Sequence, residues 1–335
     1  MHELLENLLD GEELDREGVV ALLDGLSDPD VPDVLKAAAL AAMRVRGETA
    51  AEVRDLAREL RDRAVAFEPD ASKPVVDTCG TGGDGSGSIN LSTAAALVVA
   101  AMGHGVVKHG NRRSSSKCGS ADVLEALGVP LPEGPRDAAR MLDETGFTFL
   151  FAPNFHPSTA GVVPVRRALR TRTVFNLLGP LTNPARPAYQ VVGAYSAEAA
   201  ALMADALAGL AVTRAFVVHG AEGWDEATPI GPFELWDVRP GDVVRHRELD
   251  PARAYGIPRC TADDLQGGDA DFNAAALRRV FRGEKGPHRD AVALSAALVL
   301  EVLGIAEERD AVSRVEAALD NGAVTALLTR LQSYA

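Results

Sequence analysis

The hydrophobic positions of the first 66 residues repeat at helical spacing, so this part of the chain is predicted to form helices only. The clearest apolar face has the spacing i, i+3, i+4, i+7 and i+11 and is formed by Val53, Leu56, Ala57, Leu60 and Ala64. Asp15 and Thr49 precede helical stretches, and both residue types favour the position just before a helix. We therefore expect each of them to cap a helix.

The pattern changes after a polar, proline-bounded linker at residues 67–74, because short apolar runs then alternate with helical segments. The expected strands are 75–78, 105–108, 147–151, 189–194 and 214–219. The expected helices are 92–102, 120–127, 136–145 and 197–210, and then 271–282, 290–303 and 306–319 near the end. Alternation of strands and helices predicts an α/β domain with a mostly parallel central sheet flanked by helices.

Composition narrows the class of protein. With 335 residues and 47% hydrophobic content, the chain can bury a large core and is compatible with two domains. No run of about 18 uncharged apolar residues occurs, so no membrane-spanning helix is expected. The formal net charge of −14 argues against nucleic acid as the main partner. Cys79, Cys118 and Cys260 give no disulfide framework and fit a reducing cytoplasm. A redox or nucleophilic role for the first two is the alternative to inert wall residues.

The richest chemical signal is the glycine stretch at residues 77–93, in which five glycines fall between Gly80 and Gly87. A β-prone run precedes it, and an apolar helical run that Ser92 is expected to cap follows. A strand, a glycine loop and a helix N-terminus together favour phosphate binding, because exposed backbone N–H groups and the helix dipole attract anions. The spacing matches neither the P-loop nor the Rossmann fingerprint.

A second cluster, at residues 108–120, gathers cations and hydroxyl groups in an otherwise acidic protein. Its members are Lys108, Arg112, Arg113 and Lys117, with Ser114, Ser115, Ser116 and Ser120. It follows an expected strand, and ligands of open α/β sheets bind at the carboxyl ends of strands. The reversal of charge indicates an anionic substrate. The alternative is a solvated basic loop. Ser120 can also cap the helix that it begins, and this role can coexist with ligand binding.

Two further clusters complete the candidate chemistry. Asp225 and Glu226 follow a strand and a glycine turn, where hard oxygen ligands suit Mg²⁺ bound jointly with substrate phosphates. A solvent-exposed acidic pair is the alternative. His156 precedes Arg166 and Arg167, and an arginine can hold a carboxylate through two hydrogen bonds. The alternative for His156 is a structural role.

Taken in order, these motifs form a recognisable set. They are GTGGD at 80–84, NLST at 90–93, KHGN at 108–111, GSADVLEALG at 119–128, NLLGPLTNP at 176–184 and DE at 225–226. The set resembles the anthranilate phosphoribosyltransferase family of tryptophan biosynthesis, within the nucleoside phosphorylase-like enzymes. The resemblance implies a small all-helical domain at 1–68, joined by helical pieces from about 158–186, and a large α/β domain at 74–335. It also implies a cytoplasmic, magnesium-dependent homodimer.

The activity that the resemblance implies is transfer of the phosphoribosyl group of phosphoribosyl pyrophosphate (PRPP) to the amine of anthranilate, with release of pyrophosphate. The implied PRPP site comprises Gly80, Thr81, Gly83, Asp84, Ser88, Asn90, Ser92, Thr93, Lys108, Asn111, Arg112, Ser114, Ser115, Ser116 and Ser120. The implied anthranilate site comprises Gly80, His109, Asn111, His156, Arg166 and Gly179. The implied ligands of Mg²⁺ are Ser92, Asp225 and Glu226.

The chemistry of this reaction fits the residues present. A metal ion and preorganised donors stabilise the leaving pyrophosphate, and positioning supplies much of the acceleration. An aryl amine is neutral near pH 7, so no strong base is required. His109 is a candidate proton acceptor, with solvent or pyrophosphate as alternatives.

Departures from the family pattern lie mainly toward the acceptor side. They are Cys118, the segments at 158–160 and 170–171, and the residues around the acidic pair. A substituted anthranilate or another aryl amine is therefore an alternative acceptor. A pyrimidine-nucleoside phosphorylase would not need the acidic pair or the motif at 176–184. A non-catalytic nucleic-acid-binding relative would need a basic surface.

Overall fold

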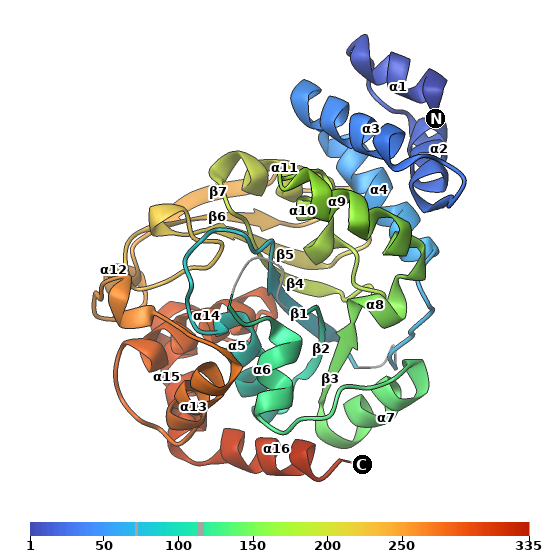
Figure 1. Ribbon diagram of the computed structural model, residues 1–335. Helices are drawn as coiled ribbons and strands as arrows, with labels where there is room; N and C mark the ends of the chain where they lie inside the picture. The colour runs from blue at the N-terminus through green and yellow to red at the C-terminus, as the bar shows by residue number, and fades with distance from the viewer. Residues whose placement is uncertain (71–72, 113–116, 335) are drawn as a thin grey trace.

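A computed structural model of the chain describes residues 1–70, 73–112 and 117–334, and Figure 1 shows its two parts. Four helices form the upper part, which we call the helical domain. They are α1 (His2–Leu9), α2 (Arg16–Ser27), α3 (Asp33–Arg46) and α4 (Ala50–Asp62). Below them lies a larger α/β domain. Within the described ranges, no helix is both long enough and apolar enough to cross a membrane.

The α/β domain is built on a seven-stranded sheet of order β3-β2-β1-β4-β5-β6-β7. The strands are β1 (Val75–Gly80), β2 (Gly105–Gly110), β3 (Phe147–Phe151), β4 (Tyr189–Gly193), β5 (Arg214–His219), β6 (Phe233–Val238) and β7 (Arg245–Leu249). The first five strands are parallel, while β6 and β7 pair antiparallel at one edge. The prediction of a mostly parallel sheet flanked by helices is confirmed.

Helices cover both faces of this sheet. The longer ones are α5 (Leu91–Ala101), α6 (Ser120–Ala126), α7 (Pro135–Thr145), α11 (Ala197–Ala208), α13 (Ala270–Phe281), α14 (Pro287–Val302), α15 (Glu308–Asp320) and α16 (Ala323–Gln332). Short α-helical turns are α8 (Ala152–Phe155), α9 (Val163–Leu169), α10 (Phe175–Leu178) and α12 (Pro251–Ala254). The 3₁₀ turns are η1 (Pro157–Val162), η2 (Gly179–Leu181), η3 (Ala221–Gly223) and η4 (Asp263–Leu265).

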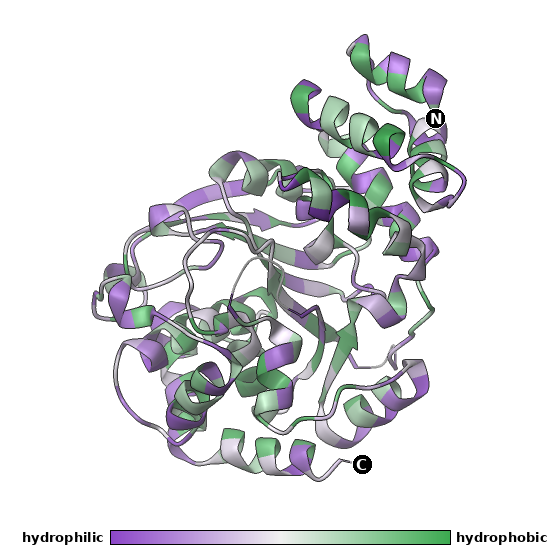
Figure 2. Ribbon diagram, viewed as in Figure 1, coloured by the Kyte–Doolittle hydropathy of each residue, from purple (hydrophilic) through white to green (hydrophobic). Residues whose placement is uncertain are grey.

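Strand β5 illustrates how alternation builds two cores. Phe216 and Val218 point to the side of α5 and α14, whereas Ala215 and Val217 point to the side of α11. All four are buried, because a central parallel strand has both faces covered. By contrast, β7 lies at the edge of the sheet, and Figure 2 shows that its residues are mostly hydrophilic.

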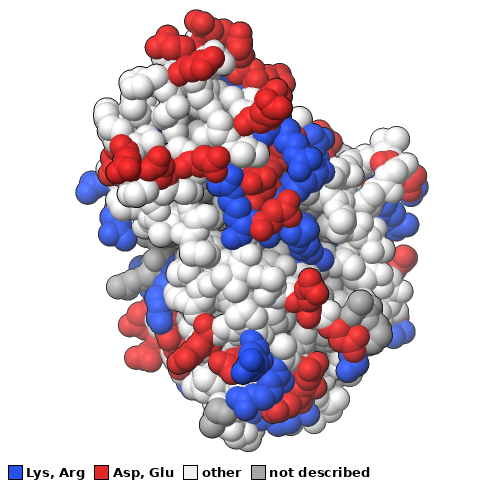
Figure 3. All heavy atoms as spheres, turned by 90° about the vertical axis from the view of Figure 1, so that its right-hand side faces the viewer, with Lys and Arg blue, Asp and Glu red and all other residues white. Residues whose placement is uncertain are grey.

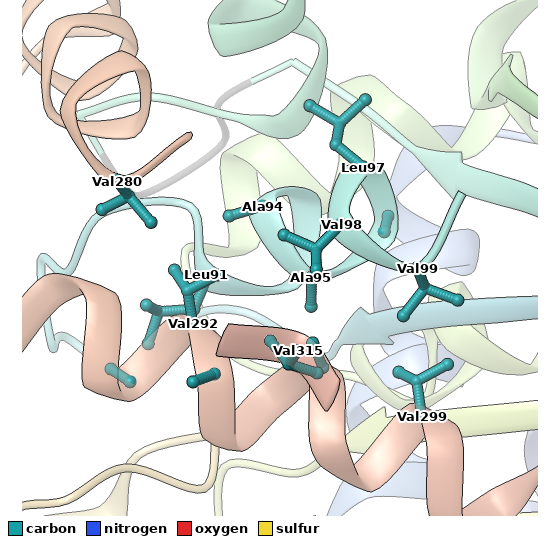
Figure 4. Packing of buried hydrophobic residues seen from close by; sticks show 14 of the residues in the cluster. Leu91, Ala94, Ala95, Leu97, Val98, Val99, Val280, Val292, Val299 and Val315 are labelled. Carbon is teal, nitrogen blue, oxygen red and sulfur yellow. The ribbon is translucent and has the colours of Figure 1, made fainter. Parts of the chain in front are cut away.

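Helix α5, which follows the glycine loop, is buried on nearly all sides. Figure 4 shows its Leu91, Ala95 and Val98 packed toward α14 and α15. Such a helix needs apolar residues around its whole circumference, and the sequence of α5 supplies them. Burying each Val or Leu side chain stabilises the fold by roughly 1.5–3 kcal/mol. The helix N-terminus at the glycine loop is therefore rigidly placed.

Two of the predicted caps are confirmed and two are wrong. The Asp15 carboxylate accepts a hydrogen bond from Gly18 N at 2.8 Å, and Thr49 forms a capping box with Glu52. Ser92 lies inside α5, whose capping position is Asn90. Ser120 is the first residue of α6, where Gly119 precedes it and the Asp122 carboxylate accepts from Gly119 N at 2.9 Å. In that helix the acid in the first turn replaces a serine cap.

Three short helical segments from the middle of the sequence pack against the helical domain. η1 packs on α2, α9 packs on α3, and α10 packs on α4. Val162, Val165 and Phe175 belong to the same buried cluster as Leu26 and Leu40. These segments therefore share a core with the helical domain although they follow β3 in the sequence, far beyond the end of α4.

Candidate active site

The candidate site lies at the carboxyl ends of the strands, where the order of the strands in the sheet reverses. Strand β1 is flanked by β2 on one side and β4 on the other, so the chain crosses over in opposite senses there. Ligands of open α/β sheets bind outside the carboxyl ends of the strands at such a point. The glycine loop leaves β1 at this edge, and the basic loop leaves β2 beside it (Figure 1).

Two glycines at the strand ends make room for the acidic pair. Gly80 of β1 and Gly193 of β4 are partners in the sheet, and Asp225 lies against both. A Cβ atom on Gly80 would overlap the Asp225 carboxylate, and one on Gly193 would overlap the Asp225 backbone carbonyl. Any side chain at these two positions would thus displace Asp225.

Hydrogen bonds hold the acidic pair in the mouth of the glycine loop. The Asp225 carboxylate accepts from Gly82 N at 2.6 Å, and Asp225 N donates to the Asp84 carboxylate at 3.2 Å. Glu226 accepts from Ser92 N, at the start of α5, at 3.1 Å. Burial and repulsion by Asp84 raise the pKa of Asp225 to about 7. Burial and repulsion by Asp225 also raise the pKa of Glu226. Clustered carboxylates of this kind need a cation to be stable in their charged form.

Lys108 connects the two ligand loops beneath this pair. Its side chain is buried, and its Nζ donates to the Thr78 carbonyl and to Ser92 Oγ, the latter at 3.3 Å. The ammonium group therefore lies at the start of α5, against the same hydroxyl that the family resemblance assigns to the metal. A fixed buried cation next to a helix N-terminus provides positive potential for a phosphate group.

The glycine loop itself is tied at several points. Thr81 N donates to the Gly193 carbonyl at 2.9 Å, and the Gly83 carbonyl accepts from Arg172 Nη2 at 2.6 Å. Asp84 accepts from Ser86 N at 3.1 Å. The loop thus has a defined shape, although Gly82 and Gly83 have positive φ angles that other residues rarely adopt.

Ser88, Asn90 and Thr93 continue from the loop into α5. Ser88 forms a bridge with Gln266, and the Asn90 amide donates to the Cys118 carbonyl at 3.2 Å. Thr93 is buried inside the helix, so its side chain faces the core. Of these three residues, Asn90 therefore joins the glycine loop to the basic loop, while the buried Thr93 hydroxyl has no hydrogen-bond partner in the described part of the chain.

The basic loop is only partly described. Ser114, Ser115 and Ser116, together with Arg113, lie outside the described residues. The exposed side chain of Arg112 pairs with Glu125, at 2.8 Å from Nη2, and lies over the Phe151 ring. The Ser120 hydroxyl donates to the Asn111 carbonyl at 3.2 Å. In this structure Arg112 is thus engaged with α6 instead of with the glycine loop.

His109 and His156 form a buried pair near Gly179. Their ring centroids are 5.1 Å apart in an edge-to-face arrangement, and His109 Nδ1 lies 3.3 Å from the Gly179 carbonyl. Burial and the neighbouring His156 lower the pKa of His109 to about 3, and burial also lowers the pKa of His156. Both rings are therefore neutral near pH 7. Since only a protonated Nδ1 can bond to a carbonyl, His109 keeps a free lone pair on Nε2.

Arg166 lies on α9 at the side of the site that faces the helical domain. Its guanidinium lies 5.3 Å from the centroid of the Phe175 ring, and burial lowers its pKa. Among the described residues, no carboxylate lies within ion-pair distance of Arg166. A half-buried arginine without an acidic partner is suited to a carboxylate ligand.

Two cavities differ in their relation to these residues. A small one, of about 20 Å³, is lined by Thr78, Ser92, Asp225, Glu226 and other residues, and it has room for about one water or ion. A larger one, of about 610 Å³, lies by the linker and the amino end of β1, at the opposite edge of the sheet. None of the predicted site residues lines it, whereas Gly80, Ser92, Asp225 and Glu226 line the smaller one.

The donor set fits Mg²⁺ only together with a ligand. Asp225, Glu226 and the Ser92 hydroxyl offer hard oxygen atoms, and burial and mutual repulsion raise the pKa of both carboxyl groups. In the described part of the chain, no group of three His, Cys, Asp or Glu side chains could hold a metal ion alone. Mg²⁺ usually takes one or two carboxylates and completes its shell with phosphates and water.

Sequence reasoning missed several residues that support the site. Gly193 gives no local signal, because its importance comes from a strand pairing and from Asp225 beyond it. Buried Asp77 accepts from Asn183 Nδ2 at 2.8 Å and from His109 N at 3.3 Å. Arg172 binds the glycine loop from the α9–α10 region. All three act through contacts between segments that are distant in sequence, although Asp77 directly precedes the glycine motif.

The comparisons with known proteins agree on one family. Residues 72–325 match the α/β domain of the glycosyl transferase family, and residues 2–64 match its helical bundle domain. The chain is 46% identical over 335 residues to the anthranilate phosphoribosyltransferase of Desulforudis audaxviator, covering 100% of this chain and 96% of the relative.

Solved structures give the same result. The anthranilate phosphoribosyltransferase of Thermus thermophilus superposes with a TM-score of 0.91 at 41% identity, covering 99% of this chain and 98% of that one. The Saccharomyces cerevisiae enzyme, in complex with PRPP and Mg, gives a TM-score of 0.85 at 25% identity, with coverages of 95% and 92%. With the fold, the ordered motifs and these matches in agreement, the chain belongs to the anthranilate phosphoribosyltransferase family.

Proposed function

We propose that this chain transfers the phosphoribosyl group of PRPP to the amine of anthranilate and releases pyrophosphate. The observation that carries the proposal is that the acidic pair is hydrogen-bonded to the phosphate loop. Gly82 N donates to the Asp225 carboxylate, and Ser92 N donates to the Glu226 carboxylate. Lys108 reaches the same Ser92 from below. A loop suited to anions and two carboxylates suited to a cation thus lie in direct contact, as the binding of a magnesium-bound pyrophosphate requires.

For the donor, we assign the glycine loop, the start of α5 and the basic loop. The residues are Gly80, Thr81, Gly83, Asp84, Ser88, Asn90, Ser92, Thr93, Lys108, Asn111, Arg112, Ser114, Ser115, Ser116 and Ser120. Backbone N–H groups of the loop, the helix dipole and Lys108 would stabilise the negative charge that grows on pyrophosphate as the C–O bond breaks. Arg112 would have to leave Glu125 in order to take part.

The proposed cofactor is Mg²⁺, held by Ser92, Asp225 and Glu226 together with phosphate oxygens of PRPP. When bound, it would neutralise the leaving group. The related yeast enzyme was solved in complex with PRPP and Mg, which supports the assignment. The raised pKa of Asp225 is in keeping with a carboxylate that is stable as an anion only beside a cation.

For the acceptor, we assign Gly80, His109, Asn111, His156, Arg166 and Gly179. The free guanidinium face of Arg166 would hold the carboxylate of anthranilate. In the reaction, the neutral amine forms a C–N bond to the anomeric carbon while the C–O bond to pyrophosphate breaks, and the amine then loses a proton.

His109 is suited to orient the amine more than to keep its proton. Its Nε2 lone pair can accept an N–H hydrogen bond from the amine. A pKa of about 3, however, makes protonated His109 unfavourable by several kcal/mol near pH 7. The proton would therefore pass on to pyrophosphate or solvent.

We also propose the domain division and the assembly that the family resemblance implies. The helical domain would comprise 1–68 with pieces from 158–186, since η1, α9 and α10 pack on its helices. The α/β domain would comprise 74–335. A homodimer formed through the helical domain and a cytoplasmic location are further parts of the proposal.

The test is consumption of anthranilate, followed by its fluorescence, with PRPP and Mg²⁺ present and with a control that lacks Mg²⁺. Magnesium-dependent loss of fluorescence is expected. If no turnover occurs although calorimetry detects PRPP binding, the donor site would stand and the acceptor would be a different aryl amine. Absence of both turnover and PRPP binding would contradict the proposed function.

A further inference from the structure

A chain of two side-chain amides, one buried and one half-buried, runs behind the donor site and connects segments that are far apart in sequence. Asn273, in the first turn of α13, is 1% exposed. Its Nδ2 donates to Asn90 Oδ1 at 2.9 Å, and its Oδ1 accepts from Gly268 N at 2.8 Å. Asn90 Nδ2 in turn donates to the Cys118 carbonyl at 3.2 Å. The chain thus joins α13, the start of α5 and the end of the basic loop.

These bonds fix the orientation of both amides. Gly268 N can only donate, so it requires the oxygen of the Asn273 amide on its side. The Asn273 NH₂ group must then face Asn90, which requires the Asn90 oxygen there and the Asn90 NH₂ group toward Cys118. The second N–H of Asn90 stays available on this half-buried side chain. An amide held in one orientation offers a ligand a donor at a fixed place.

The segment before α13 also holds the far half of the glycine loop. Gln266 Nε2 donates to the Ser86 carbonyl at 2.9 Å, and Gly267 N donates to the Gly87 carbonyl at 2.8 Å. A Cβ atom on Gly267 would come within 2.6 Å of the Ser88 carbonyl and 2.8 Å of Asn273 Oδ1. The loop, this segment and Asn273 are thus packed together without spare room.

We propose that Asn273 is a positioning residue for PRPP binding, acting through Asn90. It contacts no expected substrate group itself. By fixing the Asn90 amide it holds the glycine loop and the basic loop at one spacing, so that their donors meet the same ligand. The inference rests on the proposed function, because it assumes that both loops bind the phosphates of PRPP.

Two substitutions separate orientation from packing. Asn273→Asp keeps the shape and the acceptor for Gly268 N but cannot donate to Asn90, so the Asn90 amide should turn over. Asn273→Leu also removes the donor and adds no charge. We expect both variants to raise the KM and the calorimetric Kd for PRPP about tenfold, the loss of one well-placed hydrogen bond. The KM for anthranilate and the kcat should change less than twofold.

The matched control is Gln332→Leu, which removes an amide that donates to the Leu127 carbonyl at 2.6 Å, away from the site. It should leave the KM for PRPP unchanged. A double-mutant cycle with Asn90→Ala tests the route of action: in that background, Asn273→Asp should have almost no further effect on PRPP binding.

The outcomes are distinguishable. Lack of PRPP binding by the unchanged protein would contradict the proposed function itself. Normal PRPP binding by Asn273→Asp, or full additivity with Asn90→Ala, would overturn the positioning role. If Asn273→Leu does not fold, Asn273→Asp still decides, because it retains the bond from Gly268. A change of the same size in the KM for both substrates would also contradict the inference, since it would indicate general distortion.

Discussion

At the scale of the single residue, the acidic pair lowers the free energy of unfolding of the protein when no cation is bound. Asp225 is 8% exposed and lies beside Asp84, and these surroundings raise the pKa of its carboxyl group from 3.8 to about 7. Its charged form is therefore disfavoured by the fold until a cation arrives. Residues at binding sites often carry such a cost, which the remainder of the structure offsets.

Asp225→Asn should therefore stabilise the metal-free protein at high pH. The folded state holds a proton that the unfolded state releases near pH 4, so the stability contributed by Asp225 falls as the pH rises from about 4 to about 7. Asparagine keeps the shape and does not ionise. We expect the Tm of the variant to exceed that of the parent by a few degrees at pH 8, and the difference to vanish near pH 4.

The control for this prediction is Glu222→Gln, an exposed acid in the same loop, which changes the net charge equally. It should leave the Tm nearly unchanged at both pH values. Thermal scans with Mg²⁺ and pyrophosphate should reverse the order, because only the parent gains a metal ligand. A lower Tm of Asp225→Asn at pH 8 without metal would contradict the argument.

Arg166 provides a second residue-scale prediction. Arg166→Ala should raise the KM for anthranilate by about 10- to 100-fold, as expected for a lost charge-assisted pair with a carboxylate. The KM for PRPP should stay within twofold. Arg167→Ala, on the next and exposed position of α9, is the matched control and should change neither constant. Steady-state kinetics with each substrate varied in turn would decide, and equal damage to both KM values would reject the assigned role.

At the scale of elements, sequence patterns predicted the strands and helices that have a clear apolar pattern of their own. The five parallel strands and α5 were found from apolar runs, because a buried parallel strand is continuously hydrophobic. The edge strand β7 was missed, since its Arg245 to Leu249 sequence is mostly charged and exposed. The antiparallel partner β6 was missed with it. Candidate residues on motifs were predictable, whereas Gly193 and Asn273 act through contacts between elements, which no local pattern contains.

The pairing of β1 with β4 gives the element-scale prediction. Gly193→Ala places a methyl group onto the Asp225 backbone carbonyl, which cannot move without shifting the acidic pair. Overpacking of this kind costs typically 1–3 kcal/mol, so we expect a lower Tm and an activity loss of at least 100-fold. Gly134→Ala is the control, because nothing lies within 4 Å of its added Cβ atom and its φ of −167° suits any residue. Wild-type activity in Gly193→Ala would show that the acidic pair tolerates displacement.

At the scale of the whole molecule, the helical domain differs from the α/β domain in its surface. Figure 3 shows acidic side chains gathered over its upper end and Lys and Arg side chains gathered lower down, where it approaches the α/β domain. Three of the six large hydrophobic side chains that are exposed in the described residues lie on it: Leu9, Val34 and Val45. The domain is thus polar at its end, and Val34 and Val45 leave exposed apolar side chains on α3.

These two exposed valines of α3 are where the proposed homodimer can be tested. Val34 and Val45 are 72% and 88% exposed and lie 11 residues apart on α3, so about three turns of helix place them on one face. Burying both against a second copy would stabilise a dimer by a few kcal/mol. Val45→Glu should therefore give a monomer at micromolar concentration in light scattering coupled to size-exclusion chromatography. Val243→Glu, at an equally exposed valine between β6 and β7, should stay dimeric. A parent protein that is itself monomeric would refute the dimer. Dissociation of both variants would reject α3 as the contact, because the added charge alone would then explain the effect.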